Sequence, residues 1–141
     1  MKAVIQRVSE ASVKVDGKII NEIKKGLVVL IGFEKNDNDE KLDKMIKKII
    51  NMRLFEDKFS KSIIDIKGEI LLIPNFTIPA ITKKGTRPNF QNSMPLNEAK
   101  TMYKKMLETL NKTIITKAGI FGADMKVNLS NDGPVTIILE V

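Results

Sequence analysis

The sequence predicts an α+β fold, in which mixed or antiparallel β-sheets carry two main helices packed on one side. Three observations support this prediction. Runs of apolar residues with strand spacing occupy both ends of the chain, and two segments between them have helical spacing. The chain has 141 residues, a length typical of one domain, so we expect a single domain over residues 1–141.

The N-terminal part is predicted to form strands. Residues 2–8 and 11–15 alternate apolar and polar side chains, as half-buried strands do. Asp16-Gly17 is a strong turn dipeptide before residues 18–20, which predicts a hairpin. Residues 26–32 form a continuous apolar run that begins and ends with glycine, so we expect a central strand buried on both faces.

Two amphipathic helices are predicted in the middle of the chain. The first follows candidate caps at residues 36–39 and has about 13 residues. The second follows a loop without hydrophobic period and places Tyr103 among core positions. The apolar positions are Leu42, Met45, Ile46, Ile49 and Ile50 in the first helix and Ala99, Met102, Tyr103, Met106, Leu107 and Leu110 in the second. Between the helices, residues 69–73 predict a short buried strand that ends abruptly at Pro74.

Two further strands are predicted at the C-terminal end. Residues 125–129 alternate cleanly, and residues 135–139 are mostly apolar. The residues Ser130 to Pro134 have the composition of a turn, so we expect a second hairpin here. The chain as a whole is then predicted to contain roughly six or seven strands.

The composition excludes several kinds of chemistry. The chain contains no Cys and no His. Disulfides, thiolate nucleophiles, Ser-His-Asp triads, histidine bases and Cys/His zinc sites are therefore excluded. An enzyme with this inventory must use carboxylates, hydroxyls, Lys and Arg, backbone amides or groups of its substrate.

The net charge is +7, which favours a polyanionic partner such as nucleic acid. However, 21 of the 24 cations are Lys and they are spread along the chain, so a Lys-rich composition alone accounts for the charge equally well. The N-terminus turns polar within seven residues, and no apolar run approaches the ~20 residues that span a bilayer. We therefore expect an intracellular, cytoplasmic protein without a membrane partner.

Three segments contain residues that the packing of a core does not require. They are residues 74–80, 119–125 and 132–136. Taken singly, each is accounted for as a turn, and Gly-Pro is common in loops. Together with residues 3–8 they resemble the D-aminoacyl-tRNA deacylase family, formerly called D-tyrosyl-tRNA deacylases, over essentially the whole chain. The order and spacing of the matching stretches make the resemblance specific. These stretches are Ala3 to Val8, Ala11-Ser12-Val13, Gly26 to Gly32, Phe76-Thr77, Lys84 to Phe90, Gly119 to Met125 and Asn131 to Thr136.

The resemblance implies a homodimeric enzyme that needs no metal or cofactor. Such an enzyme hydrolyses the ester that links a D-amino acid to the 3′-terminal adenosine of tRNA, and it also removes glycine from mischarged tRNA. This activity recycles tRNA and protects translation. An aminoacyl ester is already activated, so the catalytic requirements are positioned water and stabilisation of the oxyanion.

The resemblance also implies roles for residues around the predicted strand end at Pro74. The backbone N–H groups of Phe76 and Thr77, next to Asn75, are candidates for an oxyanion hole. Thr77 has no His or Lys base in its motif, so we expect its hydroxyl to position groups rather than to act as a nucleophile. The ribose 2′-hydroxyl of the substrate is expected to assist proton movement.

Selectivity and adenosine binding are assigned by the same resemblance. A cis Gly133-Pro134 element from one protomer is expected to enter the site of the other and to reject L side chains by steric clash. Arg7 is expected to hold that element in its orientation. Phe121 and Met125 match the segment that lines the pocket for the terminal adenine, although packing in the core is the alternative for both.

One departure from the family leaves alternatives open. The family usually has Ser-Gln where this chain has Pro74-Asn75, and a related animal branch that edits L-alanine also has Pro at the first position. That branch lacks the residue equivalent to Phe76 and has Gln in place of Arg7, so these two residues favour the D-specific enzyme. The other hypotheses are a non-catalytic tRNA-binding module and, with less support, a hydrolase of small esters.

Overall fold

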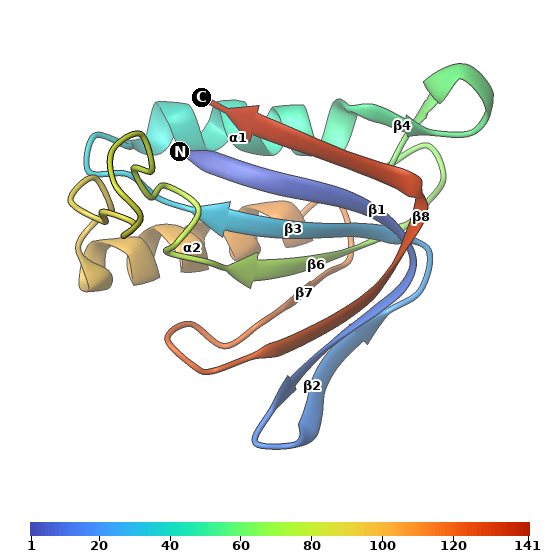
Figure 1. Ribbon diagram of the computed structural model, residues 1–141. Coiled ribbons are helices and arrows are strands. Elements are labelled where there is room, and N and C mark those ends of the chain that lie inside the picture. Colours follow the sequence, from blue (N-terminus) through green and yellow to red (C-terminus); the bar gives the residue numbers. More distant parts are fainter.

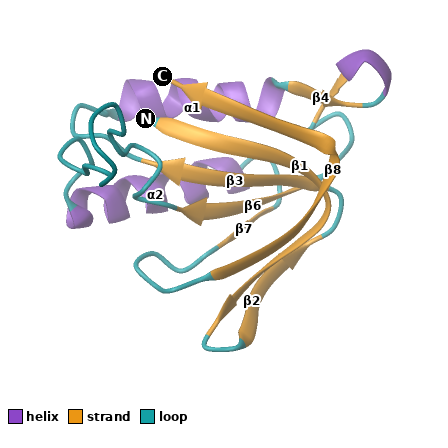
Figure 2. Ribbon diagram, in the orientation of Figure 1, coloured by secondary structure: helices purple, strands orange, loops and turns teal.

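The chain folds into a strongly curved mixed β-sheet with both helices on one face (Figure 1, Figure 2). This computed structural model describes residues 1–141. The strands are β1 (Lys2–Val15), β2 (Lys18–Ile23), β3 (Gly26–Gly32), β4 (Arg53–Phe55), β5 (Lys61–Ser62), β6 (Glu69–Pro74), β7 (Thr116–Ala118) and β8 (Lys126–Glu140), and the helices are α1 (Asp39–Asn51), a short 3-10 helix (Asp57–Phe59) and α2 (Leu96–Asn111). The main sheet has the order β2-β1-β3-β6-β7, with β8 also paired to β1, and β4 and β5 form a separate ribbon.

The N-terminal strands form as predicted. Asp16 and Gly17 both have positive φ, at 49° and 77°, which is the backbone of a tight two-residue hairpin turn between β1 and β2. β3 is antiparallel to β1 and parallel to β6, and all its residues except Leu30 are fully buried. This burial confirms the predicted central strand. It is typical of a strand with a parallel neighbour, which is covered on both faces.

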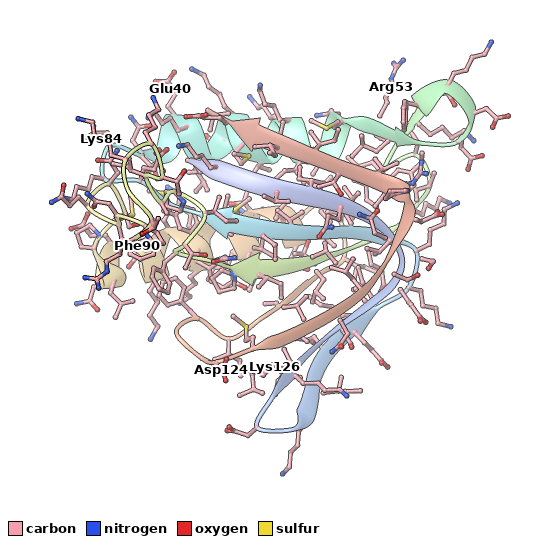
Figure 3. All side chains as sticks on the ribbon, in the orientation of Figure 1. Glu40, Arg53, Lys84, Phe90, Asp124 and Lys126 are labelled. Carbon is pink, nitrogen blue, oxygen red and sulfur yellow. The ribbon has the colours of Figure 1, made fainter.

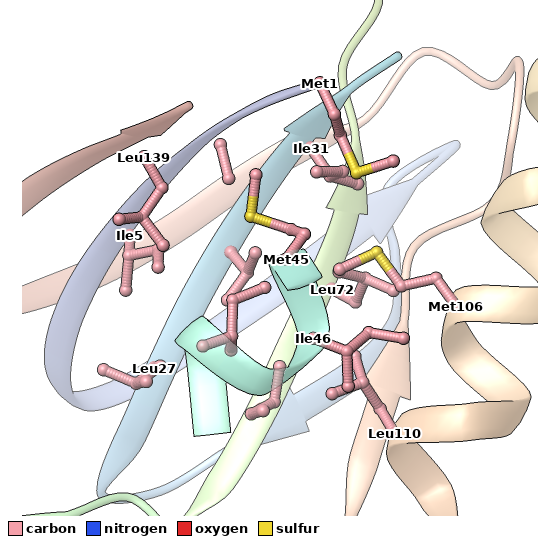
Figure 4. Close-up of a cluster of buried hydrophobic side chains, with 14 of the residues drawn as sticks. Met1, Ile5, Leu27, Ile31, Met45, Ile46, Leu72, Met106, Leu110 and Leu139 are labelled. Atoms are coloured by element: carbon pink, nitrogen blue, oxygen red, sulfur yellow. The ribbon is translucent and has the colours of Figure 1, made fainter. Parts of the chain in front are cut away.

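Both predicted helices are present, and they cover one face of the sheet. Asn38 caps α1, where its side chain accepts a hydrogen bond from the Lys41 N–H at 3.0 Å. Apolar side chains of α1, α2 and the sheet interlock in the larger core, as Figure 4 shows for Met45, Met106 and Leu72. The lysines of α1 lie on its outer side.

A second, smaller core lies on the opposite face of the sheet. β1 and β8 bend sharply, so that their outer halves and β2 curl over the face that carries no helix (Figure 1). The side chains buried there come only from strands, and they are Val8, Ala11, Val13, Ile23, Val28, Leu71 and Ile73. This curl leaves one end of the sheet open, which is the end where β6 stops.

The predicted C-terminal hairpin is wrong, because β8 is one continuous strand of 15 residues that follows β1 throughout. Residues 132–135 bulge out of the ladder opposite Arg7, with pairing resumed on either side. Asn131 holds the bulge closed, since its Oδ1 accepts from the Val135 N–H at 2.9 Å.

The short strands β4, β5 and β7 were also missed, so the structure has eight strands rather than six or seven. No helix is long and apolar enough to cross a membrane.

Candidate active site

The predicted catalytic residues lie in a turn of residues 75–79, directly after β6. The Asn75 N–H donates to the Ile31 carbonyl at 2.8 Å, which ties the start of the turn to β3. Gly32 makes room for the rest of it, because a Cβ there would lie 2.5 Å from Pro79 Cδ and 2.9 Å from the Asn75 oxygen. Sequence reasoning did not assign Gly32 to the site, although a glycine that ends a buried strand is a signal of close approach.

The hydrogen bonds within the turn leave one backbone donor free. The side-chain oxygen of Asn75 accepts from the Thr77 N–H at 3.2 Å and from the Thr77 hydroxyl at 2.6 Å. The Phe76 N–H donates to no group of the chain, while the Phe76 carbonyl accepts from the Ser93 hydroxyl at 3.3 Å. The Thr77 proton therefore faces an amide oxygen, which is not a base, and Ser93 is a supporting residue that no sequence signal indicated.

Two hollows flank this turn, and Pro74, Asn75, Phe76 and Gly122 line both. One is a groove of about 470 Å³ on the helix-free face, which is the size of a small-molecule site. The other is a pocket of about 70 Å³ under Phe76, with walls from β3 and the start of α2. The groove is therefore the hollow that can hold a nucleoside without rearrangement.

The two residues predicted to bind adenosine lie near the turn but in different hollows. Met125 lines the groove, whereas Phe121 lines the small pocket. Phe121 is half-buried and packs against Tyr103, with ring centroids 5.8 Å apart. Core packing, which was the alternative for both residues, applies to both in part, since Phe121 packs against the larger core and Met125 against the smaller one.

Tyr103 fixes the loop that carries these two residues. Its hydroxyl lies 2.9 Å from the Leu72 oxygen and 3.1 Å from the Gly119 oxygen, so it links β6 to the start of the loop. Burial raises the pKa of Tyr103 well above its ordinary value. The phenol is therefore a permanent hydrogen-bond donor, and its predicted place in the core is confirmed.

The second predicted group lies in the bulge of β8. The Gly133-Pro134 bond is cis, and Gly133 has φ +132°. The Arg7 guanidinium braces the bulge, with Nε donating to the Asp132 oxygen at 2.9 Å and Nη1 donating to the Leu54 oxygen at 2.6 Å. The contact with Leu54 connects the bulge to β4, and sequence reasoning gave no sign of it because a backbone carbonyl carries no residue signal.

The chain does not bring these two groups together. Arg7 pairs with Leu27, which pairs with Ile70, whereas the turn begins after Pro74 at the other end of β6. The rise of a strand puts roughly 13 Å between those two levels. In Figure 1 the bulge of β8 lies at one end of the sheet and the end of β6 at the other.

A third hollow, of about 650 Å³, lies between the outer half of β1 and the start of β6 and is away from both groups. Two of its charged residues are paired with each other, since Lys117 Nζ lies 3.4 Å from a Glu69 oxygen, and the other Glu69 oxygen accepts from the Lys24 backbone N–H at 3.1 Å. No group of three or more acidic residues is placed to hold a metal ion. Size alone therefore does not locate the active site.

Comparisons with known proteins agree on one family. The profile of the family described as D-Tyr-tRNA(Tyr) deacylase matches residues 4–140. A D-aminoacyl-tRNA deacylase of Nautilia profundicola is 70% identical over 141 residues and covers 100% of both chains. A D-aminoacyl-tRNA deacylase of Persephonella marina is 50% identical over 143 residues, which are 99% of this chain and 97% of the relative.

Two solved structures share the fold. One, titled c-Myc DNA Unwinding Element Binding Protein, has a TM-score of 0.96 at 44% identity and covers 100% of this chain and 99% of its own. The other is titled as a probable eukaryotic D-amino acid tRNA deacylase. It has a TM-score of 0.86 at 14% identity, over 99% of this chain and 98% of its own, and at that identity it supports the fold alone.

Proposed function

The chain belongs to the D-Tyr-tRNA(Tyr) deacylase family, and from this premise we propose that it hydrolyses the ester bond of D-aminoacyl-tRNA. The products are a free D-amino acid and tRNA, so the protein is a hydrolase that acts on carboxylic ester bonds. The proposal treats residues 1–141 as one deacylase domain. It also places the enzyme in the cytoplasm, where aminoacyl-tRNA is used.

One observation carries the catalytic part of the proposal, namely the free Phe76 N–H in a turn that lines a groove of nucleoside size. An unpartnered backbone donor can bind the oxyanion that forms when water attacks the ester carbonyl. Thr77 N–H joins it when the substrate displaces the Asn75 side chain from that donor. Asn75 and Thr77 position the substrate, and the ribose 2′-hydroxyl moves the proton, because the Thr77 hydroxyl has no base beside it.

Adenosine is proposed to enter the groove beside Met125, with Phe121 supporting the wall from the neighbouring pocket. The groove is lined mainly by apolar side chains, which suits the faces of a base. Its position next to Asn75 and Phe76 would place the 3′ ester beside the free N–H.

Selection against L-amino acids requires a second copy of the chain in this proposal. Gly133-Pro134 is exposed and lies at the far end of its own sheet, so it can act on a site only in a partner. A homodimer in which each protomer lends this element to the other site satisfies that requirement. The element blocks the space of an L side chain and leaves room for D side chains and for the hydrogen of glycine.

Paired deacylation assays test the function. Purified protein is incubated with D-aminoacyl-tRNA, L-aminoacyl-tRNA and glycyl-tRNA, and the release of amino acid is followed. We expect hydrolysis of the D and glycyl esters and protection of the L ester. Hydrolysis of L-alanyl-tRNA in preference to the D ester would instead indicate the L-alanine-editing branch, which also has Pro at the position of Pro74.

A second candidate function is nucleic-acid binding without catalysis. The net charge of +7 favours it, as does the name of the 44% identical structure, c-Myc DNA Unwinding Element Binding Protein. The same assay separates the two functions. A binding module would shift tRNA in a mobility assay but would release no amino acid from any of the three esters.

A further inference from the structure

The loop of residues 82–91 lies beside the catalytic turn and has no role in the site described above. Mutual hydrogen bonds between Ile81 and Asn89, at 2.8 and 3.1 Å, close the loop at its base. Next to this base, the Phe90 ring lies 5.5 Å from the Phe76 ring and so connects the loop to the catalytic turn. These contacts place the base of the loop beside the active site.

The loop is a local concentration of positive charge. Lys83, Lys84 and Arg87 are all exposed, and none of them has a carboxylate within ion-pair distance. The sequence from Ile70 to Asn97 contains no Asp or Glu, so no acid of the same segment offsets them. Figure 3 shows Lys84 and Phe90 together at the end of the sheet where β6 stops.

An aromatic surface accompanies the charge. Phe76 is 66% exposed and Phe90 is 39% exposed, so both rings present apolar surface to solvent. Exposed aromatic rings beside cations are the elements with which proteins hold single-stranded nucleic acid, because bases stack on the rings and phosphates pair with the cations. Neither the stacking nor the phosphate contacts depend on base sequence.

Resting on the function proposed above, we propose that this loop binds the single-stranded nucleotides that precede the terminal adenosine of tRNA. The terminal adenosine occupies the groove on one side of Phe76, and the strand then runs over Phe76 and Phe90 toward the cations. Phe90 provides a stacking face for one of these bases. Lys83, Lys84 and Arg87 contact the phosphates of these preceding nucleotides. A substrate that consists of the terminal adenosine alone does not have these phosphates.

Two substrates separate this proposal from the catalytic one. D-aminoacyl-tRNA carries the preceding nucleotides, whereas the D-aminoacyl ester of adenosine ends at the groove. Wild-type protein that hydrolyses neither substrate would contradict the proposed function itself. If the wild-type protein hydrolyses both substrates, the proposed function holds. A defect of the loop variants that is confined to D-aminoacyl-tRNA then reports on the loop alone.

The charge is tested with Lys83→Gln/Lys84→Gln/Arg87→Gln. The matched control is Lys47→Gln/Lys48→Gln/Lys112→Gln, which removes three exposed cations that likewise lack ion pairs but lie on or after the helices. For the loop variant we expect KM for D-aminoacyl-tRNA to rise about ten-fold at low salt, with kcat and hydrolysis of the adenosine ester unchanged. The salt dependence of log KM should become shallower by about 2. Equal KM values for the two triple variants would overturn the proposal.

The stacking contact is tested with Phe90→Leu, with Phe90→Tyr as the conservative variant. Loss of the ring face is expected to raise KM for D-aminoacyl-tRNA about ten-fold, whereas Tyr should restore it. Leu and Tyr variants with the same KM would overturn stacking by Phe90. Sedimentation of all variants provides the last check, since a change in oligomeric state confined to the loop variants would assign the loop to a protein interface instead.

Discussion

The two ends of the sheet are built differently. At the end of β6, the turn of residues 75–79 is fixed by one backbone hydrogen bond to β3, by Ser93 and by close packing on Gly32, and a groove adjoins it. At the other end, the Gly133-Pro134 bulge is exposed and is braced from within the chain by Arg7 and Asn131. In the proposed function, the first end is the catalytic site without its selective element, and the second end is the selective element without a site. Variants that disturb one end should therefore leave the function of the other intact.

The largest effect is expected at the catalytic end, from Gly32→Ala. The added Cβ would displace the turn through Pro79 and Asn75, and a shift of about 1 Å can cost roughly 100-fold in rate. We expect kcat/KM for D-aminoacyl-tRNA to fall by about that factor, while the preference for D over L esters stays. Gly17→Ala is the control, since it strains the β1–β2 turn at φ 77° far from either group and should lower only the melting temperature. An active Gly32→Ala enzyme would show that the turn tolerates displacement.

The next effect is expected at the selective end, from Arg7→Ala. Loss of the hydrogen bonds to the Asp132 and Leu54 oxygens frees the bulge, so discrimination against L-aminoacyl-tRNA should fall by about ten-fold while D hydrolysis changes little. Arg7→Lys keeps the charge but cannot form both bonds, and it should be intermediate. The ratio of kcat/KM values for D and L esters measures the effect. Equal ratios in wild type and Arg7→Ala would contradict a role for Arg7 in selection.

A smaller effect is expected from Thr77→Val, which removes the hydroxyl that donates to Asn75 but keeps the shape of the side chain. If Thr77 only positions groups, kcat should fall by no more than about five-fold, the cost of one hydrogen bond. Steady-state hydrolysis gives kcat, and single-turnover hydrolysis gives the rate constant of the chemical step. Loss of all activity, or a covalent amino acid on Thr77 in the wild type, would identify Thr77 as a nucleophile.

The smallest effect concerns stability at the catalytic end. Burial raises the pKa of Glu34, but its hydrogen bond to the Met1 ammonium at 2.7 Å and the charge of Lys2 outweigh this, so the net pKa lies below its ordinary value. A lowered pKa contributes stability above the unfolded value of about 4.3 and loses it as pH falls. Glu34→Gln should therefore lower the melting temperature at pH 7, by the equivalent of about 1 kcal/mol, and leave it unchanged near pH 3. The same loss at both pH values would exclude the charge as its cause.

Much of the fold could be predicted because its signals are local. The turn at Asp16-Gly17, the cap at Asn38 and the helical spacing in α1 and α2 each depend on neighbours in sequence. The continuity of β8 could not be predicted, because residues 130–134 have the composition of a turn. In the structure they form a bulge within the strand, closed by the hydrogen bond from the Val135 N–H to Asn131. The three-residue strand β7 is likewise too short to show a period.

The residues proposed for the candidate site came from the resemblance, but their placement in the fold could not be predicted. The resemblance indicated Asn75, Phe76, Thr77, Arg7 and Gly133, yet their separation follows from the registers of β1, β3 and β6, which no local pattern encodes. No local pattern indicated that Phe121 and Met125 line different hollows either. They lie on either side of Gly122, so each lines a different hollow.

The separation along β6 has a genetic consequence in the proposed dimer. A chain with Gly32→Ala still carries an intact selective element, and a chain with Gly133→Ala still carries an intact catalytic turn. When such chains exchange subunits, each mixed dimer contains one site in which both parts are normal. Random pairing would then restore about a quarter of the fully active and selective sites from two defective proteins. Two alleles that each fail alone should accordingly complement one another in the same cell.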